Sequence, residues 1–182
     1  MYHITDSLDG LYTSSFKTNF GWMRPISDNN SLIRLEWNQT GWHEADRPNH
    51  VSRETKSQLQ AFFNGYLQQF DLPISFAGKS SIRQYWLSIM KEIPYGSVIS
   101  YAEFASLAGK PKAARAAGSI CARNTIPIIY PCHRVIRTNG QFGNYGGGND
   151  QPPTYPDNLA RKAALIKFES SQVAQIKHSR FY

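Results

Sequence analysis

Hydrophobic positions in the first half of the chain follow two different periods. Residues 31–37 alternate between polar and apolar side chains, the pattern of a half-buried strand, and the shorter runs 10–13 and 21–23 also favour β-structure. After Ser52 the period becomes helical, and the predicted helix continues to the proline-containing segment 71–73. Its apolar face comprises Leu59, Phe62, Phe63, Tyr66, Leu67 and Phe70. This half is therefore predicted to combine short strands with one amphipathic helix, before a linker over 71–80.

The second half has a mostly helical pattern. A first apolar stripe at helical spacing is stopped by Pro94 and Gly96. The segment Ser100–Glu103 then has the spacing of a capping box and opens a short helix, in which Phe104 and Leu107 are predicted to face inward. The first stripe comprises Ile82, Tyr85, Trp86, Ile89 and Ile93.

A second short helix is predicted over 111–122, because Gly109 fits the end of the preceding helix and Pro111 fits the first helical position. This is helix-turn-helix spacing, although any antiparallel helix pair has a similar pattern. Small side chains let such a helix approach either a neighbouring helix or a nucleic-acid groove. Arg115 within this patch favours a groove, because a buried and unpaired arginine would be very costly. The patch comprises Lys112, Ala113, Ala114, Arg115, Ala116, Ala117, Gly118 and Ser119.

Charge is distributed unevenly along the 182 residues. The net charge is +7, and residues 1–90 are neutral, so the whole excess lies in residues 91–182. A basic half indicates either a polyanionic partner such as nucleic acid or a basic surface kept for solubility. No run of 18 apolar residues is present, and the N-terminal residues lack the pattern of a secretory signal. We expect a cytoplasmic (nucleoid-associated) or nuclear protein that is not secreted.

The two cysteines, Cys121 and Cys132, are too few for a disulfide framework or a four-ligand zinc site. A free cysteine is more often a small buried hydrophobe than a nucleophile. Cys132, however, is surrounded in sequence by cationic residues, which are predicted to lower the pKa of its thiol. If this segment is extended, Cys132 and His133 point to opposite sides, and a water would carry the proton between them. The cationic neighbours are Arg123, His133, Arg134 and Arg137.

The segment after this thiol is rich in turn residues. Residues 138–141 (Thr-Asn-Gly-Gln) predict a hairpin turn. Residues 143–148 form a glycine-rich loop that can approach a ligand closely, with Tyr145 available for stacking. The loop does not follow the P-loop pattern, so nucleotide hydrolysis is excluded.

Together these residues resemble the alkylguanine-DNA alkyltransferases, also called methylated-DNA–protein-cysteine methyltransferases. The matching segments run in the family's order from Ser81 to Glu169, about half the chain, and residues 1–75 match only in general form. The segments are Ile93-Pro94-Tyr95-Gly96, Ser100-Tyr101, Lys112-Ala113-Ala114-Arg115-Ala116, Arg123-Asn124, Pro127-Ile128, Pro131-Cys132-His133-Arg134-Val135 and Gly143-Asn144-Tyr145-Gly146-Gly147.

The resemblance implies a two-domain repair protein. Residues 1–75 would form an α/β domain, a small antiparallel sheet plus a helix. Residues 80–182 would form a mostly α, winged-helix-like domain that contains the helix-turn-helix. The protein would bind double-stranded DNA carrying O6-alkylguanine, flip out the base and transfer the alkyl group irreversibly to Cys132. The thioether product cannot be hydrolysed, so each chain would act once. We expect a monomer that uses no cofactor and no metal.

The resemblance also implies residue roles. Cys132 would be the nucleophile, His133 its water-mediated base, and Glu169 the carboxylate that holds the imidazole. Asn124 would tie the recognition helix to the active-site segment, and Tyr101 would contact the 3′ phosphate and donate to the leaving base. The residues implied in DNA binding are Arg115 (inserted into the base stack), Tyr101, Ala113, Ala114, Ala116, Gly118 and Arg123. Those implied in the base pocket are Cys121, Val135, Tyr145 and Gly146.

Two features depart from the family pattern. Residues 148–158 are an insertion of about ten residues before the last helix, which is predicted to be capped by Asp157. Glu169 is the carboxylate that this helix offers to the site. Cys121 is either inert packing or a second thiol that oxidises with Cys132. The alternative functions are a lesion-binding alkyltransferase-like protein without transfer activity, a helix-turn-helix transcription factor, and a cysteine hydrolase.

Overall fold

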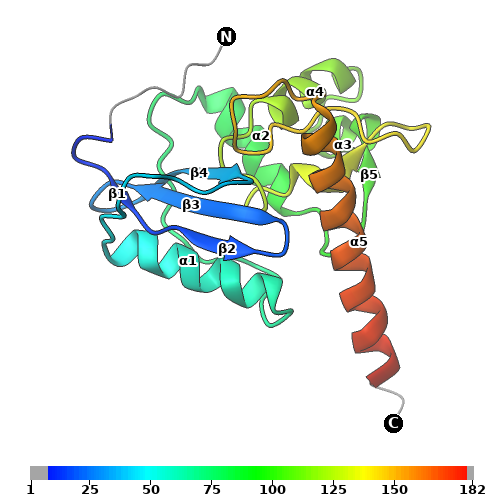
Figure 1. Ribbon diagram of the computed structural model, residues 1–182. Coiled ribbons are helices and arrows are strands. Elements are labelled where there is room, and N and C mark those ends of the chain that lie inside the picture. Colours follow the sequence, from blue (N-terminus) through cyan, green and yellow to red (C-terminus); the bar gives the residue numbers. More distant parts are fainter. Residues whose placement is uncertain (1–7, 180–182) are drawn as a thin grey trace. The chain divides into compact units, whose positions relative to one another are not determined.

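The computed structural model describes residues 8–179, with side chains to residue 176, and its chain forms two compact units. The N-terminal unit contains the residues up to 78 together with 148–150, and the C-terminal unit contains 79–147 and the residues from 151 onward. The first is an antiparallel sheet with a helix and the second is mostly helical (Figure 1), which confirms the predicted fold class. Within the described residues, no helix is both long and apolar enough to cross a membrane.

Strand β3 (Gly21–Ser27) is the centre of the N-terminal sheet. Strand β4 (Leu32–Asn38) pairs along one edge of β3, whereas β1 (Tyr12–Thr13) and β2 (Phe16–Thr18) pair with opposite ends of the other edge, all antiparallel. Helix α1 (His50–Phe63) packs beside this sheet (Figure 1). The buried apolar side chains of the unit are Phe16, Met23, Ile26, Leu32, Leu35, Trp37, Val51, Leu59 and Phe62.

Helix α1 is shorter at its end than its apolar spacing predicted. It begins at His50, where the Asn49 side chain accepts a hydrogen bond from the Ser52 amide, and it ends at Phe63. The chain turns away at Gly65, which has a φ of 80° that favours glycine. Tyr66 is therefore 86 % exposed, and the prediction of a continuous helix to residue 70 is wrong.

The C-terminal unit is built from four helices and a parallel pair of short strands (Figure 1). The helices are α2 (Ser81–Lys91), α3 (Tyr101–Leu107), α4 (Ala114–Ala122) and α5 (Pro156–Ser179), and a 3₁₀ turn, η1, spans Cys132–Arg134. The strands are β5 (Ile99–Ser100) and β6 (Val135–Ile136). Asp157 lies in the first turn of α5 and not at its cap, since the helix begins one residue earlier.

Helices α3 and α4 form the predicted helix-turn-helix, with two corrections. The capping box at the start of α3 is present, with Ser100 Oγ accepting from the Glu103 amide at 3.1 Å. Leu107 is 57 % exposed, so the prediction that it faces inward is wrong, whereas Phe104 is fully buried. Helix α4 starts at Ala114, later than the predicted start near 111, because the Ala113 amide donates to Lys110 O at 2.9 Å and closes a separate turn.

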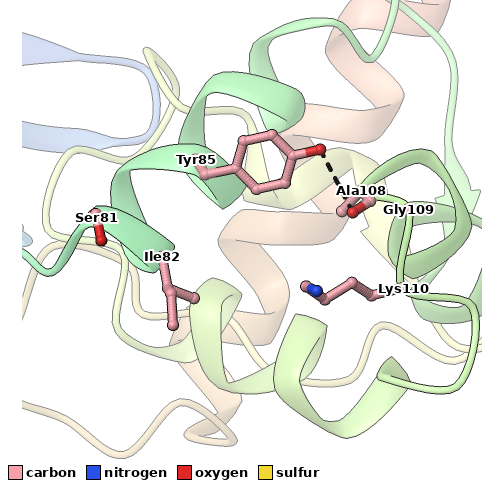
Figure 2. A pocket seen from close by; sticks show the side chains of 6 residues that line it. All are labelled: Ser81, Ile82, Tyr85, Ala108, Gly109 and Lys110. Atoms are coloured by element: carbon pink, nitrogen blue, oxygen red, sulfur yellow. Dashed lines mark hydrogen bonds between the residues drawn. The ribbon is translucent and has the colours of Figure 1, made fainter.

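The apolar stripe of α2 is only partly core. Trp86 is buried, but Ile82 is 66 % and Tyr85 46 % exposed. These two side chains line a shallow pocket beside Lys110, and the Tyr85 hydroxyl donates to Ala108 O at 3.4 Å (Figure 2). None of the residues assigned to the active site lines this pocket.

The turn predicted at 138–141 forms without a hairpin. The Arg137 amide donates to Gln141 O at 2.8 Å and closes the turn. Strand β6 pairs in parallel with β5 and not with the residues after the turn, so the predicted hairpin is wrong. Further along, the insertion begins in the N-terminal unit, where Gly148 O accepts from the Trp37 amide at 2.9 Å.

Candidate active site

The Cys132 thiol lies in one turn of 3₁₀ helix in the interior of the C-terminal unit. Cys132 and His133 are both fully buried. The turn is held by the Arg134 amide, which donates to Pro131 O at 2.9 Å. The segment is therefore not extended, so the condition under which Cys132 and His133 would point to opposite sides of a strand is not met.

Asn124 joins the end of α4 to this turn. Its Nδ2 atom donates to Tyr130 O at 2.8 Å and contacts Cys132 Sγ at 3.1 Å, while its Oδ1 atom accepts from the Ile126 amide at 3.1 Å. The side chain is buried, and all three of its contacts are to the segment that leads into the thiol. One amide thus fixes this segment and also offers a hydrogen to sulfur.

Glu169 on α5 is the acceptor for four donors. His133 Nε2 lies 2.7 Å from Oε1, and Arg134 donates from Nε and Nη2 to the two carboxylate oxygens at 2.9 Å each. The Gly96 amide adds a fourth bond at 3.0 Å. Burial alone would raise the pKa of Glu169, but His133 and Arg134 outweigh it and lower this pKa to about 2. Glu169 is therefore a carboxylate at every physiological pH.

This carboxylate determines which nitrogen of His133 carries the proton. Burial lowers the pKa of His133 more than Glu169 raises it, so the imidazole is neutral near pH 7. Since Glu169 can only accept, Nε2 must carry the hydrogen. Nδ1 is then an unprotonated acceptor, and it is buried with no hydrogen-bond partner among the described residues. The imidazole is thus prepared to take a proton.

The electrostatics of the thiol differ from the sequence prediction. Burial raises the pKa of Cys132, and the Asn124 hydrogen bond and the Lys162 charge offset only part of this rise. Arg134 is committed to Glu169, while Arg123 and Arg137 are exposed. The prediction that these cationic neighbours lower the pKa of the thiol is therefore wrong, and the resting group is a thiol that needs a base.

Tyr101 and the glycine-rich loop form a second part of the site. The Tyr101 hydroxyl accepts from the Asn144 amide at 2.9 Å and donates to Asn144 O at 3.2 Å. Gly143 has a φ of 67°, and a Cβ there would come within 2.6 Å of this hydroxyl. Burial raises the pKa of Tyr101, so the hydroxyl stays neutral. The loop can therefore approach Tyr101 only with glycine at position 143.

The residues predicted to form the base pocket are buried or nearly so. Cys121, Val135 and Tyr145 are each fully buried, and the Tyr145 hydroxyl has no hydrogen-bond partner in the described part of the chain. A Cβ at Gly146 would come within 2.8 Å of Ala122 O, so the loop packs directly against the end of α4. Burial raises the pKa of Cys121, which keeps this second thiol protonated.

The residues predicted to bind DNA lie along α4 and its ends. Arg115 and Ala116 are exposed, whereas Ala117 and Cys121 on the opposite side of the helix are buried. Ala113, Ala114 and Gly118 are half-buried, and Arg123 is exposed just after the last helical residue. This outward surface of small side chains therefore lies on the opposite side of α4 from the buried Cys121.

Sequence reasoning missed two residues that hold the site together. Arg134 was interpreted as a cation near the thiol, although it pairs with Glu169. Lys162 was not singled out, yet it is fully buried and its Nζ donates to Val135 O at 2.5 Å, Phe142 O at 2.6 Å and Asn144 O at 3.1 Å. The spacing of seven residues between Lys162 and Glu169 places both on one face of α5, and this signal could have found the lysine.

Comparisons with known proteins show which family the chain belongs to. The family model of the 6-O-methylguanine DNA methyltransferase DNA-binding domain matches residues 81–171, half of the chain. The chain belongs to this family. A methylated-DNA–protein-cysteine methyltransferase of Mycobacterium leprae is 41 % identical over 125 residues, which cover 69 % of each chain.

Solved structures of one family member extend the similarity to both units. The O6-methylguanine methyltransferase of Mycobacterium tuberculosis matches with a TM-score of 0.72 at 30 % identity, over 89 % of this chain and 94 % of that one. The same enzyme in complex with DNA matches with a TM-score of 0.70 at 30 % identity, over 87 % and 92 %. The family's N-terminal sheet and helical domain are thus both present here.

Proposed function

We propose that this protein repairs DNA by transferring the alkyl group of an O6-alkylguanine to its own Cys132. The observation that carries the proposal is the arrangement Cys132–His133–Glu169. A buried thiol is followed in the chain by an imidazole that Glu169 orients, and its Nδ1 has no hydrogen-bond partner among the described residues. Family membership supports the same chemistry, since relatives carry the name methylated-DNA–protein-cysteine methyltransferase.

The reaction is a displacement at carbon. The Cys132 proton passes through a water to Nδ1 of His133, and Glu169 stabilises the imidazolium that forms. The thiolate then attacks the alkyl carbon, so that the S–C bond forms as the C–O6 bond breaks. The electron pair stays with the guanine, which takes a proton from Tyr101 as it leaves. The proton held by His133 returns through solvent to Tyr101, so that both groups end neutral. Tyr101 must release Asn144 O to donate its proton.

The product is permanent. An S-alkylcysteine is a thioether without a carbonyl that water could attack, so the active form cannot be regenerated by hydrolysis. We infer that each chain transfers one alkyl group and is then spent. A cysteine hydrolase would instead turn over.

The helix-turn-helix is the element that would bind the DNA. Its small residues Ala113, Ala114, Ala116 and Gly118 let α4 approach a groove closely but cannot read base edges, which disfavours a sequence-specific transcription factor. A lesion inside a duplex is reachable only after the base is flipped out, and exposed Arg115 would fill the space that it leaves. The base would enter beside Cys121, Val135, Tyr145 and Gly146, and Arg123 would contact the backbone.

The remaining features follow from this chemistry. The transfer needs no cofactor, because the protein itself is the acceptor. We infer that the protein acts as a monomer wherever DNA is accessible, in the cytoplasm at the nucleoid or in the nucleus. The alternative, a lesion-binding relative without transfer activity, is disfavoured by the presence of Cys132.

The test is a stoichiometric transfer assay with duplex DNA that carries radiolabelled O6-methylguanine. We expect at most one methyl group per chain and a mass gain of one methylene on the tryptic peptide that contains Cys132. Cys132→Ser should abolish transfer but retain DNA binding, because charge and groove fit supply the affinity. Cys121→Ser is the matched control and should keep transfer. Sustained turnover, or label on Cys121, would contradict the proposed mechanism.

A further inference from the structure

Lys162 is a buried cation without an acidic partner. Its side chain is fully buried, and no carboxylate lies within ion-pair distance of Nζ among the residues whose side chains are described. Its contacts are three backbone carbonyls and the ring of Tyr101, whose centroid is 5.6 Å away. Because an isolated buried charge is expensive, a lysine kept in this position calls for a reason.

The three carbonyls indicate that the group is an ammonium. An ammonium has three hydrogens to donate, and each of the three bonds uses one. A neutral amine has two, so one of the carbonyls of Val135, Phe142 and Asn144 would lose its donor. Burial lowers the pKa of Lys162, while the Cys121 and Cys132 thiolates would raise it. The geometry thus favours the charged form in spite of burial.

The surroundings of Cys132 leave this ammonium as the available counter-charge. Lys162 is bonded to the segment that carries the thiol, because its Nζ donates to Val135 O, three residues after Cys132. The other groups that act electrostatically on the thiol are Cys121 on α4, Tyr101 on α3 and Tyr145 in the glycine-rich loop. His133, the residue after Cys132, pairs with Glu169 on α5. Cys121, both tyrosines and His133 are neutral in the resting site, and the charge of Glu169 is compensated by Arg134. Of this set, Lys162 alone has an uncompensated charge.

We propose that Lys162 is a positioning residue for alkyl transfer, whose ammonium is the counter-charge of the Cys132 thiolate while its three hydrogen bonds fix the wall of the base pocket. The inference rests on the proposed role of Cys132. In this arrangement His133 removes the proton, and Lys162 stabilises the anion that is left behind. The same lysine binds the carbonyls of Phe142 and Asn144, which flank the segment that reaches Tyr101.

The test separates this charge from a merely structural role by its pH dependence. The reaction of Cys132 with iodoacetamide is followed by peptide mass analysis from pH 6 to 10, in parallel with methyl transfer from duplex DNA. In Lys162→Met both rates should fall about tenfold or more at pH 7 and recover towards high pH, since one pKa unit is a tenfold change in thiolate. Lys162→Arg keeps the charge and should hold the profile closer to that of the unmodified protein.

Lys167→Met is the matched control, because it removes the same charge from an exposed position of the same helix. It should leave both pH profiles unchanged. A loss by the same factor at every pH in Lys162→Met would overturn the proposal and leave a purely structural lysine. If instead Cys132→Ser retains methyl transfer while the thiol titration still depends on Lys162, the proposed function fails and the present inference about the counter-charge stands.

A second measurement compares two proteins that both retain Lys162, so it does not depend on whether a Lys162 variant folds. The ε-carbon signals of ¹³C-labelled lysines are titrated in the unmodified protein and in Cys132→Ser, and the Lys162 signal is assigned by its absence in Lys162→Arg. Removal of the Cys132 thiolate should lower the pH at the midpoint of the Lys162 titration, because the ammonium and the thiolate stabilise each other. An identical midpoint in the two proteins would overturn the proposal.

Discussion

Each unit of the molecule buries one glutamate between two basic side chains, and the two networks differ in what they leave available. In the N-terminal sheet, Glu36 accepts from Arg24 at 2.7 and 2.9 Å and from Arg34 at 3.1 Å. In the C-terminal unit, Glu169 accepts from His133 and from the neighbouring arginine at 2.7–2.9 Å. The carboxylates have nearly the same surroundings, but one donor is an imidazole in place of a guanidinium.

This difference determines what each network can do. Arginine stays protonated at every accessible pH and has no acceptor atom, so the Glu36 network cannot exchange a proton. The Arg24 guanidinium of this network also packs on an aromatic ring, with its Cζ atom 4.3 Å from the centre of the Trp42 ring. His133 has a second nitrogen that Glu169 holds in the acceptor state. One network therefore stabilises a sheet, while the other holds a proton acceptor on the residue that follows Cys132.

The largest expected contrast comes from the same substitution in each network. Glu169→Gln should slow methyl transfer at least tenfold near pH 7, because the amide no longer stabilises the His133 imidazolium. The rate should recover as the pH rises towards the pKa of the Cys132 thiol, which burial has raised. Glu36→Gln should leave transfer per folded molecule unchanged. It should instead lower the free energy of unfolding by about 3 kcal/mol, because it removes the buried carboxylate beside Arg24 and leaves this arginine with the more distant, exposed Glu44.

Single-turnover rates across pH and denaturant unfolding check both halves of this contrast. The active fraction is counted first by methyl incorporation at saturation, so that a loss of folded protein is not mistaken for a loss of rate. If Glu169→Gln transfers methyl groups at the same rate as the unmodified protein at pH 7, Glu169 does not support the proton transfer from Cys132 to His133. A slow but fully folded Glu36→Gln would show that the sheet network contributes to transfer.

A second contrast separates base flipping from chemistry within the C-terminal unit. Arg115→Ala should lose a factor of about ten to a hundred on duplex DNA with the lesion, because the inserted guanidinium no longer replaces the flipped base. It should react almost normally with free O6-benzylguanine, which needs no flipping. Tyr101→Phe should slow both substrates, since its hydroxyl is assigned to the leaving base. A pair of single-turnover rates for each variant is the measurement.

Lys112→Ala is the charge-matched control for Arg115→Ala, because it removes one exposed cation just before α4. It should weaken duplex binding modestly and shift its salt dependence by about one phosphate contact. Equal losses on duplex and free base in Arg115→Ala would mean that the residue supports the fold of the site. An unchanged duplex rate would exclude it from the interface.

The sequence predicted features that depend on neighbouring residues better than contacts between segments that lie far apart in the chain. The Ser100 capping box and the succession of α3 and α4 follow from neighbouring residues, and they are present as predicted. Arg134 was misinterpreted because sequence adjacency to a thiol gives no side-chain direction, and only the 3₁₀ turn shows that it points to Glu169. Lys162 was missed for a related reason, since its partners are backbone carbonyls, which every residue has and which the sequence therefore cannot distinguish.

The end of α1 shows the opposite error, in which a regular pattern was followed too far. The spacing of apolar residues continues past Phe63, but the chain turns at Gly65. Phe70 still packs on Phe62, with ring centres 5.5 Å apart, and does so from outside the helix. Periodicity therefore identified residues that pack together, such as Phe62 and Phe70, although it also included the exposed Tyr66. The backbone conformation at a single glycine decided which of them are helical.

The smallest expected effect compares the two capping boxes, one in each unit. Asn49→Ala should cost about 2 kcal/mol, because its side chain accepts from the Ser52 amide and Ser27 Oγ and also donates to Asp28 O. Ser100→Ala should cost about 1 kcal/mol, since its exposed hydroxyl caps one amide. Hydrogen exchange of peptides covering α1 and α3 measures each loss locally, with Asn49→Asp and Ser100→Thr as cap-retaining controls. Equal losses at both sites would mean that the tertiary bonds of Asn49 add nothing to its role as a cap.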